Sequence, residues 1–470
     1  MSSENTSAEE SNQQALAVSS TKSLSTRTIA LASRGLQDLR TTGQAEQWLK
    51  TGLEFHRQQR YEDGFRCFER GIQLNPDHPK LQFMIGVSYH EGQSVPQDCA
   101  RAAAWWRKAA EQGYASAQYN LGVLYRDGSG VPQDYAQAAV WYRKAADQGD
   151  AEGQCSFGAL YNNGQGVTQD HVQAAAWYRK AADQGLADAQ CKLGFLYSHG
   201  QGVPQDYAQA AVWYRKAAEK GKRNAQNSLG ESYYYGRGVA QDYAQAAVWY
   251  RRAAEQGDVD AQYSLGHLRY RGWGVSLDYV EAVVWWRMAA EQGDAAAQCC
   301  LGFAYGHGEG VPQDYAQAAV WYRKAAEQGD ASAQNHLGYA YLRGFGVPQD
   351  PAQAATWFRK AAEQGNSIAQ YNLGILYDDG HGVPQDYAQA LTWLCKAAEQ
   401  GDADARAALE AMRKTESAPV SSSDRPYPKL SEDQKKRIAE AVGTTLPNLN
   451  LPISDDASSG DQSSGRSRPL

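Results

Sequence analysis

The sequence lacks the features that define several common protein classes. No apolar run approaches the roughly 20 residues that span a bilayer, and the polar, acidic start at residues 1–14 has no apolar core of a secretory signal. The cysteines number seven and form no CxxC pair, which argues against a secreted disulfide framework or a zinc ribbon. These absences predict a protein of the reducing cytoplasm, without membrane insertion, although non-classical export as an effector stays open.

Charge and histidine spacing also indicate no chemical site. The net charge is −7, and Lys and Arg are spread along the chain instead of forming a basic stripe, so we expect no nucleic-acid partner. The nine histidines show no HxxxH or HExxH spacing, so we expect no metal and no cofactor. The SxxK run at Ser19–Lys22 and the KTG run at Lys50–Gly52 stand in an arm and inside an expected helix. We therefore predict no catalytic residues and no enzyme activity.

A fixed period of 36 residues dominates the rest of the chain. The run VPQDYAQAAVWYRKAADQGD at residues 131–150 recurs with small changes, and each copy is followed by a segment resembling AQYNLGVLYRDGSG. One glycine marks the phase of every copy without any insertion: Gly86, Gly122, Gly158, Gly194, Gly230, Gly266, Gly302, Gly338 and Gly374. Such a period is the signature of a solenoid, in which stacked units bury surface that no unit can bury alone.

Each unit reads as two helices joined by a link. In the copy at 115–150 the first helix is expected over 115–127, with Gly128 after its end and Pro132 fixing the entry to the second. Asp134 is expected to cap the second helix, with Gln137 completing a capping box. An Asp recurs at this cap in all nine units, and a Trp recurs seven residues later as inter-helix filling: Trp105, Trp141, Trp177, Trp213, Trp249, Trp285, Trp321, Trp357 and Trp393.

These motifs resemble the Sel-one-like repeat, a relative of the tetratricopeptide repeat with a longer link. The resemblance covers about residues 79–414 and implies an all-α, right-handed α-solenoid that acts as an adaptor or scaffold in protein complexes. Secreted cysteine-rich members are linked to penicillin binding and carry a Cys pair in each repeat, which this chain lacks. A penicillin-binding or β-lactamase-like hydrolase and a host-directed effector on the same scaffold remain the alternative functions.

The ends of the array differ from its middle. Residues 1–44 are expected to be a disordered arm, and residues 45–78 fit a tetratricopeptide-like unit through Trp48, Gly52, Phe55, Phe68 and Pro76. Nine 36-residue repeats then fill 79–402, and a polar helix at 403–414 is expected to cap them. Residues 415–470 are expected to be mostly disordered, with a short docking helix at 431–442 as the alternative to a plain tail.

Comparing the repeats with one another separates a constant side of the first helix from a variable one. At about 100° per residue, the constant positions lie on one side, and the variable ones fall three and two residues before the phase glycine and one, four and five after it. In related helix-pair solenoids the first helix lines a concave groove. Aromatic, Asn and Arg side chains are typical of protein recognition, although neutral filling is the alternative. The predicted groove residues, with Trp273 projecting from a link, are Phe83, Tyr119, Asn120, Arg126, Asn163, Phe195, His199, Asn227, Tyr234, Tyr263, His267, Tyr270, Trp273, Phe303, His307, Asn335, His336, Tyr339, Arg343, Tyr371 and Asn372.

Overall fold

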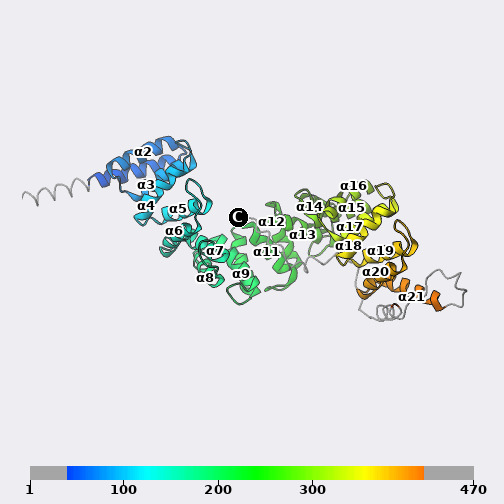
Figure 1. Ribbon diagram of the computed structural model, residues 1–470. Coiled ribbons are helices and arrows are strands. Elements are labelled where there is room, and N and C mark those ends of the chain that lie inside the picture. Colours follow the sequence, from blue (N-terminus) through cyan, green and yellow to red (C-terminus); the bar gives the residue numbers. More distant parts are fainter. Residues whose placement is uncertain (1–39, 418–433, 435–470) are drawn as a thin grey trace, which may run out of the picture. The chain divides into compact units, whose positions relative to one another are not determined.

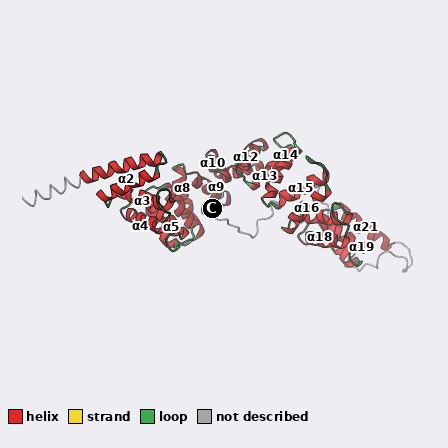
Figure 2. Cartoon of the chain, turned by 90° about the horizontal axis from the view of Figure 1, so that it is seen from above, coloured by secondary structure: helices red, strands yellow, loops and turns green. Residues whose placement is uncertain are grey.

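The computed structural model describes residues 40–417 and Gln434, and over these residues it contains helices and loops without strands (Figures 1 and 2). Two compact units divide the chain between Ala225 and Gln226, and each is described by itself. The sequence-predicted helix at 431–442 lies outside the described residues except for Gln434, so it stays a prediction. No helix of the described part combines the length and the hydrophobicity needed to cross a membrane.

The first unit begins with the segment that the sequence predicts to be a tetratricopeptide-like unit, and it continues with four helix pairs. A helix over the described residues 40–57 precedes α2 (Tyr61–Leu74), so residues 40–44, assigned to the arm by the sequence, are already helical. The pairs then follow in chain order, as Figure 1 shows: α3 (Pro79–Glu91) and α4 (Cys99–Glu111), α5 (Ala115–Asp127) and α6 (Tyr135–Asp147), α7 (Ala151–Asn163) and α8 (His171–Asp183), α9 (Ala187–His199) and α10 (Tyr207–Glu219).

The second unit continues the same alternation. Helix α11 (Arg223–Tyr235) crosses the division between the units, and α21 (Ala403–Ser417) ends the array three residues beyond the predicted capping helix. Between them lie α12 (Tyr243–Glu255), α13 (Val259–Arg271), α14 (Tyr279–Glu291), α15 (Ala295–His307), α16 (Tyr315–Glu327), α17 (Ala331–Arg343), α18 (Pro351–Glu363), α19 (Ser367–Asp379) and α20 (Tyr387–Glu399). All nine repeats therefore have two 13-residue helices, and the fold is an all-α solenoid.

The cap of the second helix is confirmed, but its predicted capping box is wrong. Asp134 Oδ1 accepts hydrogen bonds from the backbone N–H groups of Ala136 and Gln137 at 2.9 and 3.0 Å. A capping box would give the Asp134 N–H to the Gln137 side chain. That N–H instead donates to the Tyr125 carbonyl at 2.8 Å, and the same contact recurs in all nine repeats. This hydrogen bond thus holds the end of each link against the last turn of the first helix of the same repeat.

The phase glycine marks the closest approach of the two helices in a repeat. A Cβ on Gly122 would lie 2.7 Å from the Tyr142 ring, and one on Gly194 would lie 2.7 Å from the Tyr214 ring. Even in the tetratricopeptide-like unit, a Cβ on Gly52 would lie 2.4 Å from Phe68. Real Cβ atoms do not approach other atoms so closely, so the aromatic ring occupies the space that a side chain would need.

The tryptophan file packs between neighbouring helix pairs, as predicted. Trp141 joins a hydrophobic cluster formed by α4 and α5, and Trp285 joins the one formed by α12 and α13. Five of the nine are buried and four are half-buried. A Lys or Arg of the next helical turn lies over eight of these rings, as Lys144 lies over Trp141 at 4.1 Å.

A ladder of buried glutamines ties the repeats together, and sequence reasoning missed it. The Gln148 amide donates to Gln118 Oε1 at 2.7 Å, and the Gln118 amide donates to the Ala110 carbonyl of the preceding repeat at 3.0 Å. Seven further repeats hold the same Gln–Gln bond. Repeat 187–222 is different, because Lys220 replaces the glutamine and bonds the Gly185 carbonyl, which leaves the buried Gln190 Oε1 without a partner.

Two glycines of α15 test the close contact. Gly302→Ala would place a Cβ 2.8 Å from the Tyr322 ring, and we expect it to lower the free energy of unfolding by about 1–3 kcal/mol. Gly306→Ala is the matched control, because its Cβ would meet nothing closer than 3.8 Å, and it should be neutral or stabilising by up to about 1 kcal/mol. Urea denaturation of the three proteins measures both changes. Equal effects of the two substitutions would contradict the contact.

Lys220→Gln should repair the glutamine ladder. The new side chain would bond Gln190 Oε1, and in repeat 151–186 the equivalent Gln184 also bonds the Gly149 carbonyl at 2.9 Å. We expect the first unit to gain about 1 kcal/mol of unfolding free energy, since a buried acceptor regains its donor. The reverse change, Gln184→Lys, is the control and should destabilise the same unit by a similar amount. A lower free energy of unfolding in Lys220→Gln would show that the unpaired Gln190 Oε1 does not destabilise the first unit.

Candidate functional site

The variable positions of the first helices form one set of side chains, which we call the first-helix face. Their exposure differs within each unit. Phe195, Asn163 and His199 are exposed in the first unit, and Tyr339, His307 and Arg343 are exposed in the second. The other predicted groove residues of this face, with Trp273 of the link, are half-buried, apart from His267 and Asn335.

His267 and Asn335 are corrections to the predicted surface. Only 9% of His267 and 7% of Asn335 is exposed. The ring of Trp273, 5.4 Å away, covers His267 edge-on, and the amide of Asn372 donates to Asn335 Oδ1 at 3.1 Å. These two side chains support the surface from beneath, so they offer a partner little area of their own.

In the first unit the first-helix face is bounded by rings. Phe83 lies 5.2 Å from Tyr114 and 6.2 Å from Trp106, and Tyr119 lies 5.8 Å from Tyr142. Asn120 and Trp106 line a hollow of about 240 Å³ between α3 and α5, together with Val87, His90, Glu91 and Val123. This hollow is open and shallow, and it offers aromatic edges with one amide.

In the second unit the rings of successive first helices contact one another. Tyr270 lies 6.3 Å from Phe303, and Phe303 lies 6.5 Å from His336 of the next first helix. Tyr234 lies 6.3 Å from Trp273. Tyr263 packs against the cluster that contains Cys300. The structure therefore brings predicted residues of α13, α15 and α17 into one continuous surface.

Three rings of this face share a local motif. The residue one after the phase glycine carries a ring, and the residue four later covers that ring with an imidazole or a guanidinium. Phe195 stacks with His199 and Phe303 with His307, both at 4.0 Å, and Arg343 lies 5.6 Å from the centre of the Tyr339 ring. An i,i+4 pair on a helix makes this contact possible. It presents a flat apolar plate with a polar edge.

Burial shifts the pKa values of two thiols and one imidazole of this face toward the neutral form. It raises the pKa of Cys155 to about 12 and that of Cys191 to about 11. Burial and, to a smaller extent, the charge of His307 lower the pKa of His336 to about 4. All seven cysteines are free thiols. A thiol with a raised pKa is a poor nucleophile, so Cys155 and Cys191 are poor nucleophiles.

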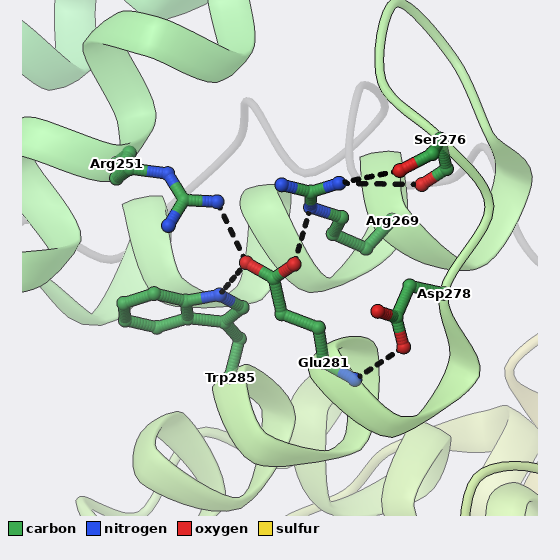
Figure 3. A network of polar contacts seen from close by, with 6 residues as sticks. All are labelled: Arg251, Arg269, Ser276, Asp278, Glu281 and Trp285. Carbon is green, nitrogen blue, oxygen red and sulfur yellow. Dashed lines mark hydrogen bonds and ion pairs between the residues drawn. The ribbon is translucent and has the colours of Figure 1, made fainter.

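Sequence reasoning missed a polar network in repeat 259–294, which Figure 3 shows. Glu281 Oε1 accepts from Arg251 at 2.6 Å and from the indole N–H of Trp285 at 3.2 Å, and Arg269 Nε lies 2.8 Å from Glu281 Oε2. Burial alone would raise the pKa of Glu281, but the bonds from Trp285 and Arg251 and the charge of Arg269 hold it below its usual value. Two departures from the repeat, Arg269 and Glu281, are the sequence signal of this network.

Those departures replace one set of contacts by another. Elsewhere the residue at the place of Arg269 is a tyrosine. In five repeats its hydroxyl accepts from the arginine of the preceding second helix, as Tyr305 accepts from Arg287 at 2.9 Å. With an arginine there, two guanidinium groups face each other, and Glu281, at a position where eight repeats have Gln or Arg, neutralises them. Glu281 therefore compensates for the replacement of tyrosine by Arg269, and the network has a structural role.

No metal-binding group of three or more His, Cys, Asp or Glu occurs within residues 40–417. The Lys50–Gly52 run lies inside the first described helix, where Thr51 Oγ1 donates to the Gln47 carbonyl at 3.0 Å. The Ser19–Lys22 run lies outside the described residues.

Comparison with known proteins agrees with this geometry. The family model of the Sel1 repeat matches nine consecutive segments: residues 79–114, 115–150, 151–186, 187–222, 223–258, 259–294, 295–330, 331–366 and 367–402. A protective antigen present in uropathogenic Escherichia coli strains, which displays an SLR fold, is 34% identical, with a TM-score of 0.53 over 89% of this chain and 99% of that one. A Sel1 repeat protein from Oxalobacter formigenes is 36% identical, with a TM-score of 0.50 over 70% of this chain and 93% of that one. No curated protein matches the chain.

Glu281→Gln tests the network of Figure 3. It leaves Arg251 and Arg269 facing each other without an anion, and we expect a loss of about 1–3 kcal/mol in unfolding free energy at pH 7. Since the folded-state pKa of Glu281 is lowered, its contribution is present above the unfolded pKa and is lost as the pH falls through the folded pKa. The difference between parent and variant should therefore shrink below about pH 4. Urea denaturation at pH 7 and pH 3.5 measures it, with Gln317→Ala at the same place in α16 as the control that changes little.

Proposed function

Because the chain belongs to the Sel1 repeat family, we propose that it is a non-catalytic adaptor that binds a protein partner along its first-helix face. The partner is an extended segment or a helix. Stacked helix pairs with a repeat fold are commonly scaffolds for protein interaction, and curved arrays of this kind offer long binding surfaces.

One observation carries the proposal. The exposed large apolar side chains in the middle of the second helices are mostly valines, such as Val140, Val212 and Val320, whereas the first-helix face exposes large rings. Phe195 is 45%, Tyr235 48% and Tyr339 42% exposed. Tyr207 and Tyr315 at the starts of second helices are also exposed, but their hydroxyls are bonded within the scaffold, to Gln205 and Gln313.

The composition and rigidity of the face fit protein recognition. Aromatic residues and arginine dominate the binding energy of protein interfaces, because they bury large areas with little loss of side-chain entropy. The rings of Phe195, Phe303 and Tyr339 are already covered on one side by their i+4 neighbours. A surface that is held in place before binding loses less entropy when a partner docks.

The thiols support a non-catalytic role. A nucleophile needs a lowered pKa or an adjacent base, whereas burial raises the pKa of Cys300 to about 12 and also raises that of Cys299. The cysteine pairs of the penicillin-linked branch are absent. The adaptor therefore fits the described residues better than the hydrolase does.

Tyr235→Glu combined with Tyr339→Glu, both in the second unit, should abolish partner binding while leaving the fold intact, because the two rings are 48% and 42% exposed. Affinity capture is compared between the parent and the double variant, and the captured partner is titrated against both proteins. We expect a loss of at least about 30-fold in affinity, as for two central hot-spot rings. Val212→Glu combined with Val320→Glu is the control on the second helices and should retain the partner. Unchanged capture by the first double variant would refute the first-helix face as the binding surface.

A further inference from the structure

Four exposed apolar side chains follow α14 and the link before it. Leu277 is 54%, Val280 62%, Val284 51% and Met288 40% exposed. Their spacing of three, four and four residues places them on one side of the helix. We call these four residues the α14 stripe.

The other eight repeats carry no such stripe. In repeat 295–330 the same positions hold Gln313, Ala316, Val320 and Lys324. There the lysine lies over the Trp321 ring at 4.0 Å, whereas Met288 supplies no charge at the equivalent place. All four positions are large and apolar in repeat 259–294 alone.

The hydrogen bonds that hold the link also differ in this repeat. In the other repeats a glutamine of the link bonds the last turn of the first helix, as the Gln313 amide bonds the Gly306 carbonyl at 2.8 Å. Leu277 cannot make that bond. Arg269 instead donates to Ser276 O and Oγ at 3.3 and 3.1 Å, as Figure 3 shows, so the link stays held while Leu277 projects into solvent.

The stripe is too small to hold a free partner firmly. Four side chains that are about half exposed offer a few hundred Å², whereas a stable interface between separate proteins buries about 1,200–2,000 Å² in total. A tethered segment needs much less, because a short flexible linker gives it an effective concentration in the millimolar range. The size of the stripe therefore favours an occupant from the same chain.

We propose that residues 431–442 dock on the α14 stripe of the same molecule as an amphipathic helix. Ile438, Ala441 and Val442 recur at helical spacing and form its apolar side. Gln434, the one described residue of this segment, is helical and half-buried. It precedes Ile438 by four residues and so lies on that apolar side.

The tether is long enough. Helix α21 ends at Ser417, and the 17 residues to Gln434 span up to about 58 Å when extended. Helices α14 and α20 are three repeats apart in the second unit. Because equivalent helices of neighbouring repeats lie about 10 Å apart, α14 and α20 are separated by roughly 30 Å. The segment can therefore reach the stripe without disturbing the array.

Charge gives the docked helix a direction. Lys435, Lys436 and Arg437 directly precede the apolar side of the segment. At the other end of the contact, Glu291 follows the stripe by one turn, and α12 and α16 end on glutamates at the same place. An antiparallel helix would lay its basic start on these carboxylates and its apolar residues on the stripe, which is electrostatically favourable.

Hydrogen–deuterium exchange of the full-length chain tests the proposal. In the parent we expect the amides of 431–442 to exchange about tenfold or more slowly than an unstructured peptide, independently of protein concentration. Val284→Glu in the stripe and Ile438→Glu in the segment should each remove this protection. Val320→Glu is the matched control at the same position of α16, 48% exposed, and should keep it.

Each other outcome overturns the proposal. Exchange of 431–442 at the unstructured rate in the parent means that no helix docks. Equal loss of protection in Val284→Glu and Val320→Glu, or none in either, means that the stripe is not the site. Protection that grows with protein concentration means that the occupant belongs to a second copy. None of these results alters the capture experiment on the first-helix face, so the two proposals fail separately.

Discussion

Two helices of a repeat meet where an aromatic ring or a leucine lies against the backbone of a glycine. The contact holds with Tyr142 on Gly122, Trp286 on Gly266, Phe358 on Gly338 and Leu394 on Gly374. The type of the large side chain varies from repeat to repeat, whereas the glycine is constant. What is kept constant is therefore the short distance between the two helices. The remaining packing depends on that distance, since each Trp of the outer file fills the space left between one pair and the next.

Polar contacts repeat with the same period and fix the register of the helices, which apolar packing alone specifies less tightly. Each link returns an aspartate N–H to its own first helix, and the glutamine ladder satisfies buried amides from one repeat to the next. A buried polar group costs free energy unless it is bonded. These bonds therefore favour one register of stacking, and they explain why every repeat has the same length.

The sequence predicted the regular part of the fold closely and the irregular part poorly. The bounds of the helix at 115–127 and the cap at Asp134 follow from local signals, and both are confirmed. The prediction for Gln137 was wrong because the Asp134 N–H donates to the carbonyl of Tyr125, nine residues earlier. No local sequence pattern reveals that bond. Periodicity places a residue on a side of a helix but does not tell how deeply neighbours cover it. That is why His267 and Asn335 were expected on the surface and are buried. Arg269 and Glu281 stand out when the repeats are aligned with one another, yet only coordinates show that they bond each other.

The absence of insertions between the phase glycines has a consequence for the length of the array. In a quasi-one-dimensional fold each repeat contacts only its neighbours. Excision of one whole period, such as residues 295–330, would join Asp294 to Ala331, and Ala331 begins the next first helix as Ala295 does. The spliced chain would meet the same kinds of neighbour on both sides of the cut. The number of periods can therefore change by whole units without redesign of the joints, which makes the length of the array an adjustable property of this architecture.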